Sequence, residues 1–451
     1  MLNRVAGITA PMRNAEMGRA CSPSLFNYVT IQRHCARCKE DKELEFVIKL
    51  DRIMALLLIA AVVAILTRRL KVPYTVGLVC AGIILSLSPF FSDIPFTKDL
   101  IFNLFLPPLV FEAAIQIHWK DLRKQFFVVL VLATLGVCLS GAVTALGMRY
   151  LAGWEWVSAL LFGALIAATD PVSVIATFKE AGVHGRLRLL VEAESLFNDG
   201  TAAVAFAVIL ASALGSGLNI SGIAVTLMVT IVGGVLCGAL VAGAILLLAG
   251  QTKDYLVEFT FTTVAAYASF LLAEHFHFSG VLASLTAGLL VGNLGPLGAI
   301  SPRGREAITA YWEYLGFLVN SLIFISIGVY ESRQHFTTVL VPAVIAILLV
   351  LLGRAVAVYP CCAVFRRSNL RVQGKHQFVL FWGGLRGALA LALAMGLPPW
   401  VPNREAIISV TFAVVAFSVF AQGLSMTPLL RRMGEIAPTH VIVNQGETLH
   451  E

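Results

Sequence analysis

The chain has 451 residues, of which 58% are hydrophobic and only 13% are charged. That charged share is about half the share found in soluble proteins, and a mean hydropathy of +0.85 leaves too little polar surface to cover a water-soluble globule. The formal net charge of +7 lies mainly in short segments between apolar runs, so it does not indicate a protein that binds nucleic acid. The composition predicts an integral membrane protein.

Apolar runs near the length that crosses a bilayer recur along the chain, separated by short polar loops. They predict an all-α polytopic protein with a transmembrane domain over residues 53–432 and about 13 helices, near residues 53–67, 73–89, 100–117, 126–148, 157–178, 189–213, 221–249, 256–273, 278–293, 312–329, 338–365, 378–397 and 404–424. Residues 1–52 are polar, and we interpret them as an extramembrane segment or an artefact of start-site choice. Residues 433–451 form a short tail.

Lys and Arg gather in alternate loops. The loops after odd-numbered spans hold sixteen of these residues, and the loops after even-numbered spans hold four, if Arg404 at the first position of the last span is counted. Because basic loops remain on the cytoplasmic side, we expect the odd-numbered loops inside the cell, the N-terminus outside and the C-terminus in the cytoplasm. An odd number of spans requires such opposite termini. The predicted location is the plasma (inner) membrane.

The fifth span reads FGALIAATDPVSVIATF and carries Asp170 immediately before Pro171. Proline removes one backbone N–H and clashes with the carbonyl of Ala167, four residues back, and it also disfavours helix at Asp170. We therefore predict a break at Thr169–Asp170, with freed carbonyl groups beside a carboxylate. Irregular backbone at this depth is tolerated where it is buried or lines a cavity, and hard cations favour such oxygen-rich sites.

The sixth span contains EAESLFNDG. A charge at mid-bilayer costs about 2.5–3.5 kcal/mol on insertion scales, so acids at this depth are not lipid-facing filler. Glu194 and Asn198 are four residues apart and share one helix face. Ser195 and Asp199 form a neighbouring stripe. One stripe is expected to face a structural partner and the other a cavity. Glu112, in LPPLVFEAA of the third span, is either an acid at the cavity entrance or a residue close to the interface.

Two arginines lie in the eleventh and twelfth spans. Arg354 is the candidate partner of Glu194, because arginine stays protonated and suits a permanent pair. Arg386 lies among glycines in FVLFWGGLRGALALALAMGL, which loosen that span, and we expect it near the first break, offsetting Asp170. Alternatively, Glu194, Arg354 and Arg386 could have only a structural role, as members of an ion pair. Asp199 is left as the acid without a fixed cationic partner, so one carboxylate would hold either a proton or a cation.

The positions of the two interrupted spans match. If spans 1–6 and 8–13 are two six-helix repeats, span 5 corresponds to span 12, and the separation of seven spans makes the repeats inverted. Discontinuous helices at corresponding places in two halves point to the binding site of a secondary transporter. We therefore predict a transporter rather than an enzyme, with no resident cofactor.

Three motifs are shared with a known family: TDPVSV at 169–174, ESLFNDG at 194–200 and GGLRGA at 383–388. Over roughly residues 55–432 the chain resembles the monovalent cation–proton antiporters that include the sodium–proton exchangers. The resemblance implies that Asp199 carries the ion and the proton, and that Asp170 and Thr169 help to form the site. Glu194 and Asn198 match a structural pair that engages an arginine, here Arg354.

The expected Na+ site is thus Asp199, Asp170, Thr169 and Ser195, with Asn198 beside it. An Asn-Asp pair is similar to that of electroneutral exchangers, which implies one proton for each cation. The family is typically homodimeric, embedded in lipid, and works by elevator-like movement of a core domain. Such a protein would exchange Na+ or Li+ for H+ and contribute to pH homeostasis.

Two alternatives stay open at this point. One is a potassium–proton exchanger of the same architecture. The other is an intramembrane aspartyl hydrolase with a dyad of Asp170 and Asp199, which would leave Arg354 and Arg386 unexplained. A channel is a poorer match, because no repeated filter sequence is present.

Overall fold

The structure is a computed structural model that describes residues 51–70, 72–88, 100–170, 185–213, 220–331 and 336–435, with residues 174, 175, 178, 182 and 183. Within these ranges the chain forms helices and turns and no strand. It divides into two compact units, residues 1–54 and residues 55–451, and the helices α2 to α17 all belong to the second. Most of the predicted N-terminal segment (1–52) and of the tail (433–451) lies outside the described residues.

Helices occupy all thirteen predicted positions. They are the helix Asp51–Leu70, α2 (Tyr74–Leu85), α3 (Leu106–Gln116), α4 (Trp119–Val131), α5 (Val137–Leu151), α6 (Trp156–Ala167), α8 (Arg186–Ala213), α9 (Ile220–Ala249), α10 (Tyr255–His275), α11 (Gly280–Leu294), α12 (Pro302–Glu331), α13 (Phe336–Val364), α14 (Gly374–Trp382), α15 (Ala388–Met395), α16 (Arg404–Phe417) and α17 (Leu424–Arg432). Short π-helical segments η2 (Leu100–Phe105), η3 (Leu132–Gly136) and η5 (Ser418–Gly423) extend α3, join α4 to α5, and join α16 to α17.

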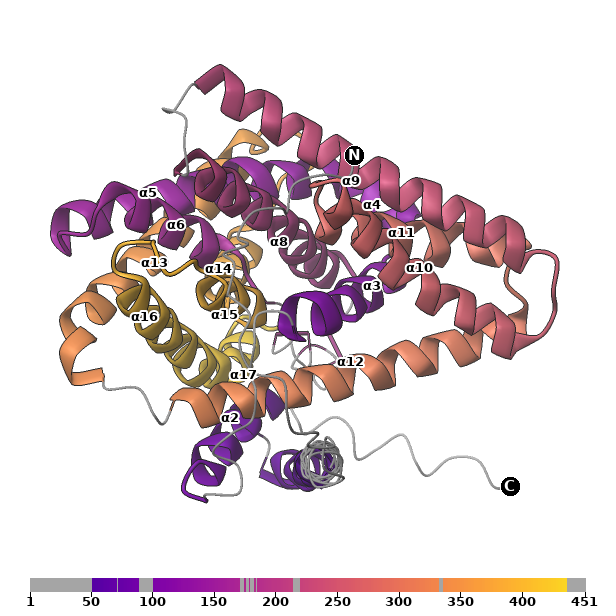
Figure 1. Ribbon diagram of the computed structural model, residues 1–451, viewed down its shortest axis with the longest axis horizontal. Helices are drawn as coiled ribbons and strands as arrows, with labels where there is room; N and C mark the ends of the chain where they lie inside the picture. The colour runs from indigo at the N-terminus through magenta and orange to yellow at the C-terminus, as the bar shows by residue number, and fades with distance from the viewer. Residues whose placement is uncertain are drawn as a thin grey trace, which may run out of the picture. The chain divides into compact units, whose positions relative to one another are not determined.

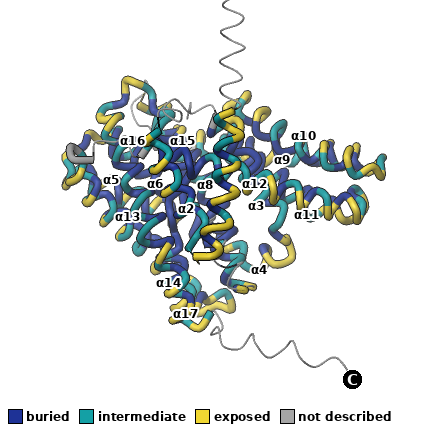
Figure 2. The backbone as a smooth tube through the Cα atoms, turned by 90° about the horizontal axis from the view of Figure 1, so that it is seen from below, coloured by how far each residue is buried: buried dark blue, intermediate teal, exposed yellow. Residues whose placement is uncertain are grey.

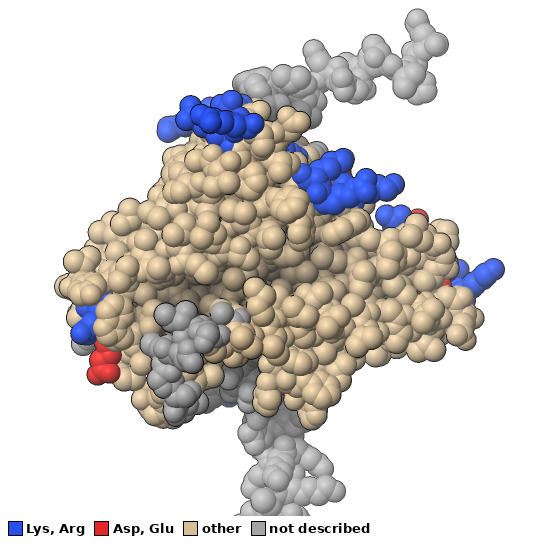
Figure 3. Space-filling view, turned by 90° about the horizontal axis from the view of Figure 1, so that it is seen from above, with Lys and Arg blue, Asp and Glu red and all other residues tan. Residues whose placement is uncertain are grey.

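The outer faces of several helices carry large apolar side chains. Leu240 and Leu247 on α9 and Leu348 on α13 are exposed, and Figure 2 shows exposed and buried positions alternating along these helices. On the face drawn in Figure 3, Lys and Arg lie in a few patches, and most of the surface carries no charged side chain. Nine described helices are long and apolar enough to cross a bilayer. An exposed apolar surface of this kind requires lipid around it.

Helix packing follows the predicted two repeats. α2 packs along α12 and α3 packs along α11. By span number, α2 and α12 are spans 2 and 10, and α3 and α11 are spans 3 and 9. The predicted repeat relates span 2 to span 9 and span 3 to span 10, so it maps each of these two pairs onto the other. α5 packs along α13, a pair that the same repeat maps onto itself. The pattern of neighbours is therefore the one that two six-helix repeats produce.

Packing also separates the helices into two groups. The α12 group consists of residues 55–70, α2, α3 and α9–α12, and the α8 group consists of α4, α5, α6, α8 and α13–α17. Inside each group, helices cross at glycine, as at Gly82 with Gly328 and at Gly141 with Gly163, where an added Cβ would meet the backbone of the partner helix. Between the groups, Gly200 of α8 faces the side-chain end of Leu282 of α11. α14 and α15 lie beside α8 near the centre of Figure 1.

Candidate functional site

The first broken helix is interrupted where the sequence predicts. α6 ends at Ala167, and Ala168 has an extended backbone with φ −60° and ψ 140°. The Thr169 N–H donates to the Asn198 side-chain oxygen at 3.1 Å, and the Asp170 N–H donates to the Leu385 carbonyl at 2.8 Å. The second of these bonds joins the two broken helices directly. The backbone groups freed by the break are therefore satisfied by protein.

The second break separates α14 from α15 and covers residues 383–387. The Ser418 hydroxyl, on η5, accepts the Arg386 N–H at 3.1 Å and lies 2.8 Å from the Val415 carbonyl, to which it donates. The Gln422 amide donates to the Trp382 carbonyl at 3.0 Å. The α16–η5–α17 segment thus holds the second break in place.

The glycines of the second break make room for charged side chains. A Cβ built on Gly384 would stand 2.5 Å from Nε of Arg354. A Cβ built on Gly387 would overlap the Asp170 side chain and lie 2.6 Å from its Cγ. The sequence interpretation, in which these glycines loosen the helix, is therefore incomplete, because they also let Arg354 and Asp170 pack against the backbone.

Arg354 and Glu194 form a buried bidentate ion pair. Nη1 and Nη2 of Arg354 lie 2.7 and 2.8 Å from the two carboxylate oxygens of Glu194, and Nη2 also donates to the Leu380 carbonyl at 2.9 Å. The Asn198 amide donates to the same carboxylate at 2.9 Å. Charge-assisted bonds of this geometry are strong. The pairing inferred from residue type and spacing is thus present, whereas the functional role of the pair stays a prediction.

Asn198 also fixes the first break from behind. Its Nδ2 donates to the Thr169 hydroxyl at 2.6 Å, and that hydroxyl lies 3.0 Å from the Ser195 hydroxyl. All three side chains are buried. Of the three residues, only Thr169 lines the cavity described below. Asn198 and Ser195, both predicted ion-site residues, therefore lie behind the cavity wall.

Arg386 lies at the first break, as predicted, but it does not bond to Asp170. It is 1% exposed, and its Nη1 donates to the carbonyls of Ala167 and Ala168 at 2.8 Å each. No described residue accepts a hydrogen bond from its Nε or Nη2. Arg386 thus lies near the first break, as expected, and its role in offsetting the Asp170 charge stays a prediction. The guanidinium lies on the carbonyl end of α6, where the helix dipole favours a positive charge.

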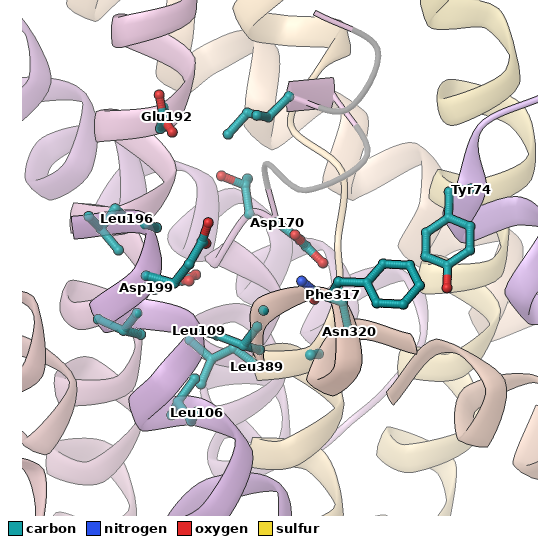
Figure 4. Close-up of a pocket in the computed structure, with 18 of the residues that line it drawn as sticks. Tyr74, Leu106, Leu109, Asp170, Glu192, Leu196, Asp199, Phe317, Asn320 and Leu389 are labelled. Carbon is teal, nitrogen blue, oxygen red and sulfur yellow. The ribbon is translucent and has the colours of Figure 1, made fainter. Parts of the chain in front are cut away.

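A cavity of about 410 Å³ opens between the two helix groups. Its acidic lining residues are Glu112, Asp170, Glu192, Asp199 and Glu313. In Figure 4, Asp199 lies between Glu192 on one side and the leucines Leu106 and Leu109 on the other. Within the part of the chain that the structure describes, no residue forms a hydrogen bond or ion pair with the Asp199 carboxylate.

The α12 group supplies cavity residues that the sequence reasoning missed. Glu313, Phe317 and Asn320 of α12 line the cavity together with Asp170. Glu313 lies at the start of the predicted tenth span, and an acid within a predicted span was the signal that could have identified it. Glu112 lines the same cavity and bonds to Gln116. This favours the prediction that Glu112 is an acid of the cavity entrance over a position close to the membrane interface.

A second cavity, of about 700 Å³, shares Gln116 and Glu192 with the first. Basic side chains dominate its charged lining, namely His118, Lys124, Arg186, Arg188 and Arg305, with Asp121 and Glu192 as the acids. The two cavities are therefore adjacent. The second is rich in basic side chains, and the first, which contains Asp170 and Asp199, is rich in carboxylates.

Two broken helices that meet beside partly buried carboxylates, on a cavity between two helix groups, define an ion-coupled secondary transporter. Residues 56–432 match the family described as sodium/hydrogen exchanger, transmembrane, and the chain belongs to that family.

Similar proteins carry related names. The chain is 37% identical over 370 residues to the low-affinity Na+/H+ antiporter NhaS1 of Synechocystis sp., covering 80% of this chain and 69% of the relative. It is 38% identical over 374 residues to the Na+/H+ antiporter ApNhaP of Aphanothece halophytica, covering 81% and 70%. Its fold is similar to that of the sodium proton antiporter MjNhaP1 from Methanocaldococcus jannaschii, with a TM-score of 0.69, 21% identity, and coverage of 86% and 99%.

Proposed function

We propose that the protein exchanges Na+, or Li+, for protons, and that both ions compete for Asp199. The observation that carries this proposal is the position of the Asp199 carboxylate on the cavity, without a hydrogen bond or ion pair to any described residue. Asp170 and Thr169 line the same cavity and offer further oxygen atoms. Hard cations prefer such ligands, and a carboxylate that loses its cation in a desolvated place favours protonation.

The charges around the site support exchange of one proton for one cation. Arg354 and Glu194 cancel in their ion pair, and Arg386 offsets the ionised Asp170 in the sum of charges. Asp199 then contributes one negative charge, which either a proton or a Na+ ion neutralises. Because the loaded site carries the same net charge with either ion, we propose an electroneutral 1:1 antiporter.

The cavity supports alternating access from one side at a time. The cavity adjoins the basic second cavity, with which it shares Gln116 and Glu192, and Asp199 lies between Glu192 and the leucines Leu106 and Leu109 (Figure 4). Basic loops mark the cytoplasmic side, so we propose that the site faces the cytoplasm in this conformation, in a plasma membrane with the C-terminus inside. The opposite state would follow from movement of the α8 group along the α12 group.

The family supports the remaining parts of the proposal. The relatives are named Na+/H+ antiporters, which favours sodium over potassium as the cation. Membership of an exchanger family does not favour the aspartyl hydrolase. We further propose a lipid-embedded homodimer that contributes to pH and sodium homeostasis.

Exchange in everted vesicles tests the proposal. An inside-acid pH gradient is imposed, and Na+, Li+ or K+ is added separately. Na+ and Li+ should dissipate the gradient in the wild type and not in Asp199→Asn. The matched control is Asp254→Asn, the same change at the exposed N-cap of α10, where asparagine caps as well as aspartate. Full exchange by Asp199→Asn would refute the assignment, and exchange with K+ alone would favour potassium.

The stoichiometry needs a second measurement. With the membrane potential set by valinomycin at different K+ ratios, the rate of an electroneutral exchanger does not change. A rate that depends on the potential would contradict the 1:1 proposal while leaving the role of Asp199 intact.

A further inference from the structure

Asp170 packs directly against Gly387, across the contact between the two broken helices. A Cβ on Gly387 would overlap Oδ2 and Cβ of Asp170 and stand 2.6 Å from Cγ. The φ angle of Gly387 is −148°, and residues other than glycine adopt such values. A left-handed φ therefore does not account for glycine at residue 387. The adjacent Asp170 side chain leaves no room for a Cβ there.

Asp170 has little freedom to move away from an added methyl group. Its N–H is bonded to the Leu385 carbonyl at 2.8 Å, and the preceding Thr169 is held by Asn198 through its N–H at 3.1 Å. Rotation about χ1 moves the carboxylate but leaves Cβ in place, so it cannot remove the overlap with Cβ. A methyl group at residue 387 must therefore shift the two broken helices relative to each other.

We propose that Gly387 is a positioning residue that sets where the Asp170 carboxylate stands relative to Asp199, and thereby the size of the cation that the site accepts. This inference rests on the proposed cation site. Its physical basis is that cation selectivity depends on the placement of oxygen ligands around the ion and on the flexibility of those ligands. A displaced Asp170 changes that placement without removing a ligand.

The test compares Gly387→Ala with the wild type in proteoliposomes, measuring half-saturation concentrations for Li+, Na+ and K+. The concentration for Na+ should rise by about tenfold or more, equivalent to about 1.4 kcal/mol, and the ratios among the three cations should change. The control is Gly374→Ala, in the same broken span, where an added Cβ meets nothing within 4 Å. It should leave all three values unchanged.

Three results distinguish a failure of the Gly387 proposal from a failure of the proposed function. If folded Gly387→Ala keeps the wild-type values, the proposal is overturned. If all three half-saturation concentrations rise by one common factor, Gly387 does not set cation size and the proposal is likewise overturned. If the wild type itself exchanges no cation, the proposed function fails, whatever the variant does.

A loss of folding in Gly387→Ala is also informative. The double variant Asp170→Gly, Gly387→Ala lacks the overlapping side chain, so it should fold as well as Asp170→Gly alone. Size-exclusion profiles and thermal unfolding midpoints in detergent measure this. A double variant that folds no better than Gly387→Ala would show that the overlap with Asp170 is not what residue 387 avoids, and would overturn the proposal.

Discussion

The two broken helices meet at one contact, but they contribute different groups to the site. The first break, residues 168–170, brings a hydroxyl and a carboxylate to the cavity and is held from behind by Asn198. The second, residues 383–387, brings no acid. It contributes space at its glycines and one buried arginine, and Ser418 holds it. In matching positions of two repeats, one break thus carries the ion chemistry and the other shapes and charges its surroundings.

This difference separates the expected effects of substitution. Changes around the second break should reduce the free energy of unfolding, because the groups there pack against buried charges. Changes at the first break should reduce exchange while the protein stays folded. The four variants below run from the largest expected loss of stability to the smallest.

Arg354→Ala should have the largest effect. It leaves Glu194 as an uncompensated buried charge, and breaking such a pair costs about 3–5 kcal/mol. Denaturant unfolding in detergent measures the loss. Arg354→Ala combined with Glu194→Ala should recover part of it. An unfolding midpoint equal to that of the wild type in the single variant would contradict a structural role for the pair.

Gly384→Ala should come second. The added Cβ would stand 2.5 Å from Nε of Arg354, and overpacking of this kind costs about 1–3 kcal/mol. The thermal midpoint of the purified variant gives the loss, with Gly374→Ala as the control for placing alanine in the same span. Equal midpoints for the two variants would show that Arg354 moves aside without cost.

Ser418→Ala should cost about 1 kcal/mol, because the buried Arg386 N–H loses its acceptor. Ser212→Ala is the matched control, since that hydroxyl only donates to a carbonyl of its own helix. A larger loss in the control than in Ser418→Ala would remove the argument that η5 supports the second break.

Asp170→Asn should reduce stability least and exchange most. The amide has nearly the shape of the carboxylate, and Asp170 is only partly buried, so we expect less than about 0.5 kcal/mol of lost stability. The exchange rate in vesicles should fall roughly a hundredfold, equivalent to about 2.7 kcal/mol. Wild-type exchange in this variant would contradict the division between the two breaks.

Properties of short sequence segments predicted much of this arrangement. Hydropathy located the spans, the Asp-Pro pair located the first break, and the spacing of Glu194 and Asn198 placed both on one face toward Arg354. These inferences need only the helix period and the backbone preferences of proline. Roles assigned to the cavity residues stay predictions until exchange is measured.

Contacts between distant segments were not predictable in the same way. Arg386 bonds to carbonyl groups rather than to Asp170, because the local break turns those carbonyls toward it while Asp170 packs on Gly387. Glu313 reaches the cavity through the packing of α12 on α2 and α3. Both facts depend on how helices far apart in sequence are placed, which hydropathy and spacing do not specify.

The glycine contacts also affect how fast the site can switch its access from one side of the membrane to the other. At Gly82 with Gly328, and at Gly141 with Gly163, backbone meets backbone, so no side chain can yield and each group should behave as a stiff body. At the boundary, Gly200 meets only the flexible end of Leu282. A leucine can change rotamer without backbone motion, so we expect turnover to be limited by the segments that join the groups, such as the two residues between α3 and α4, rather than by friction at the boundary.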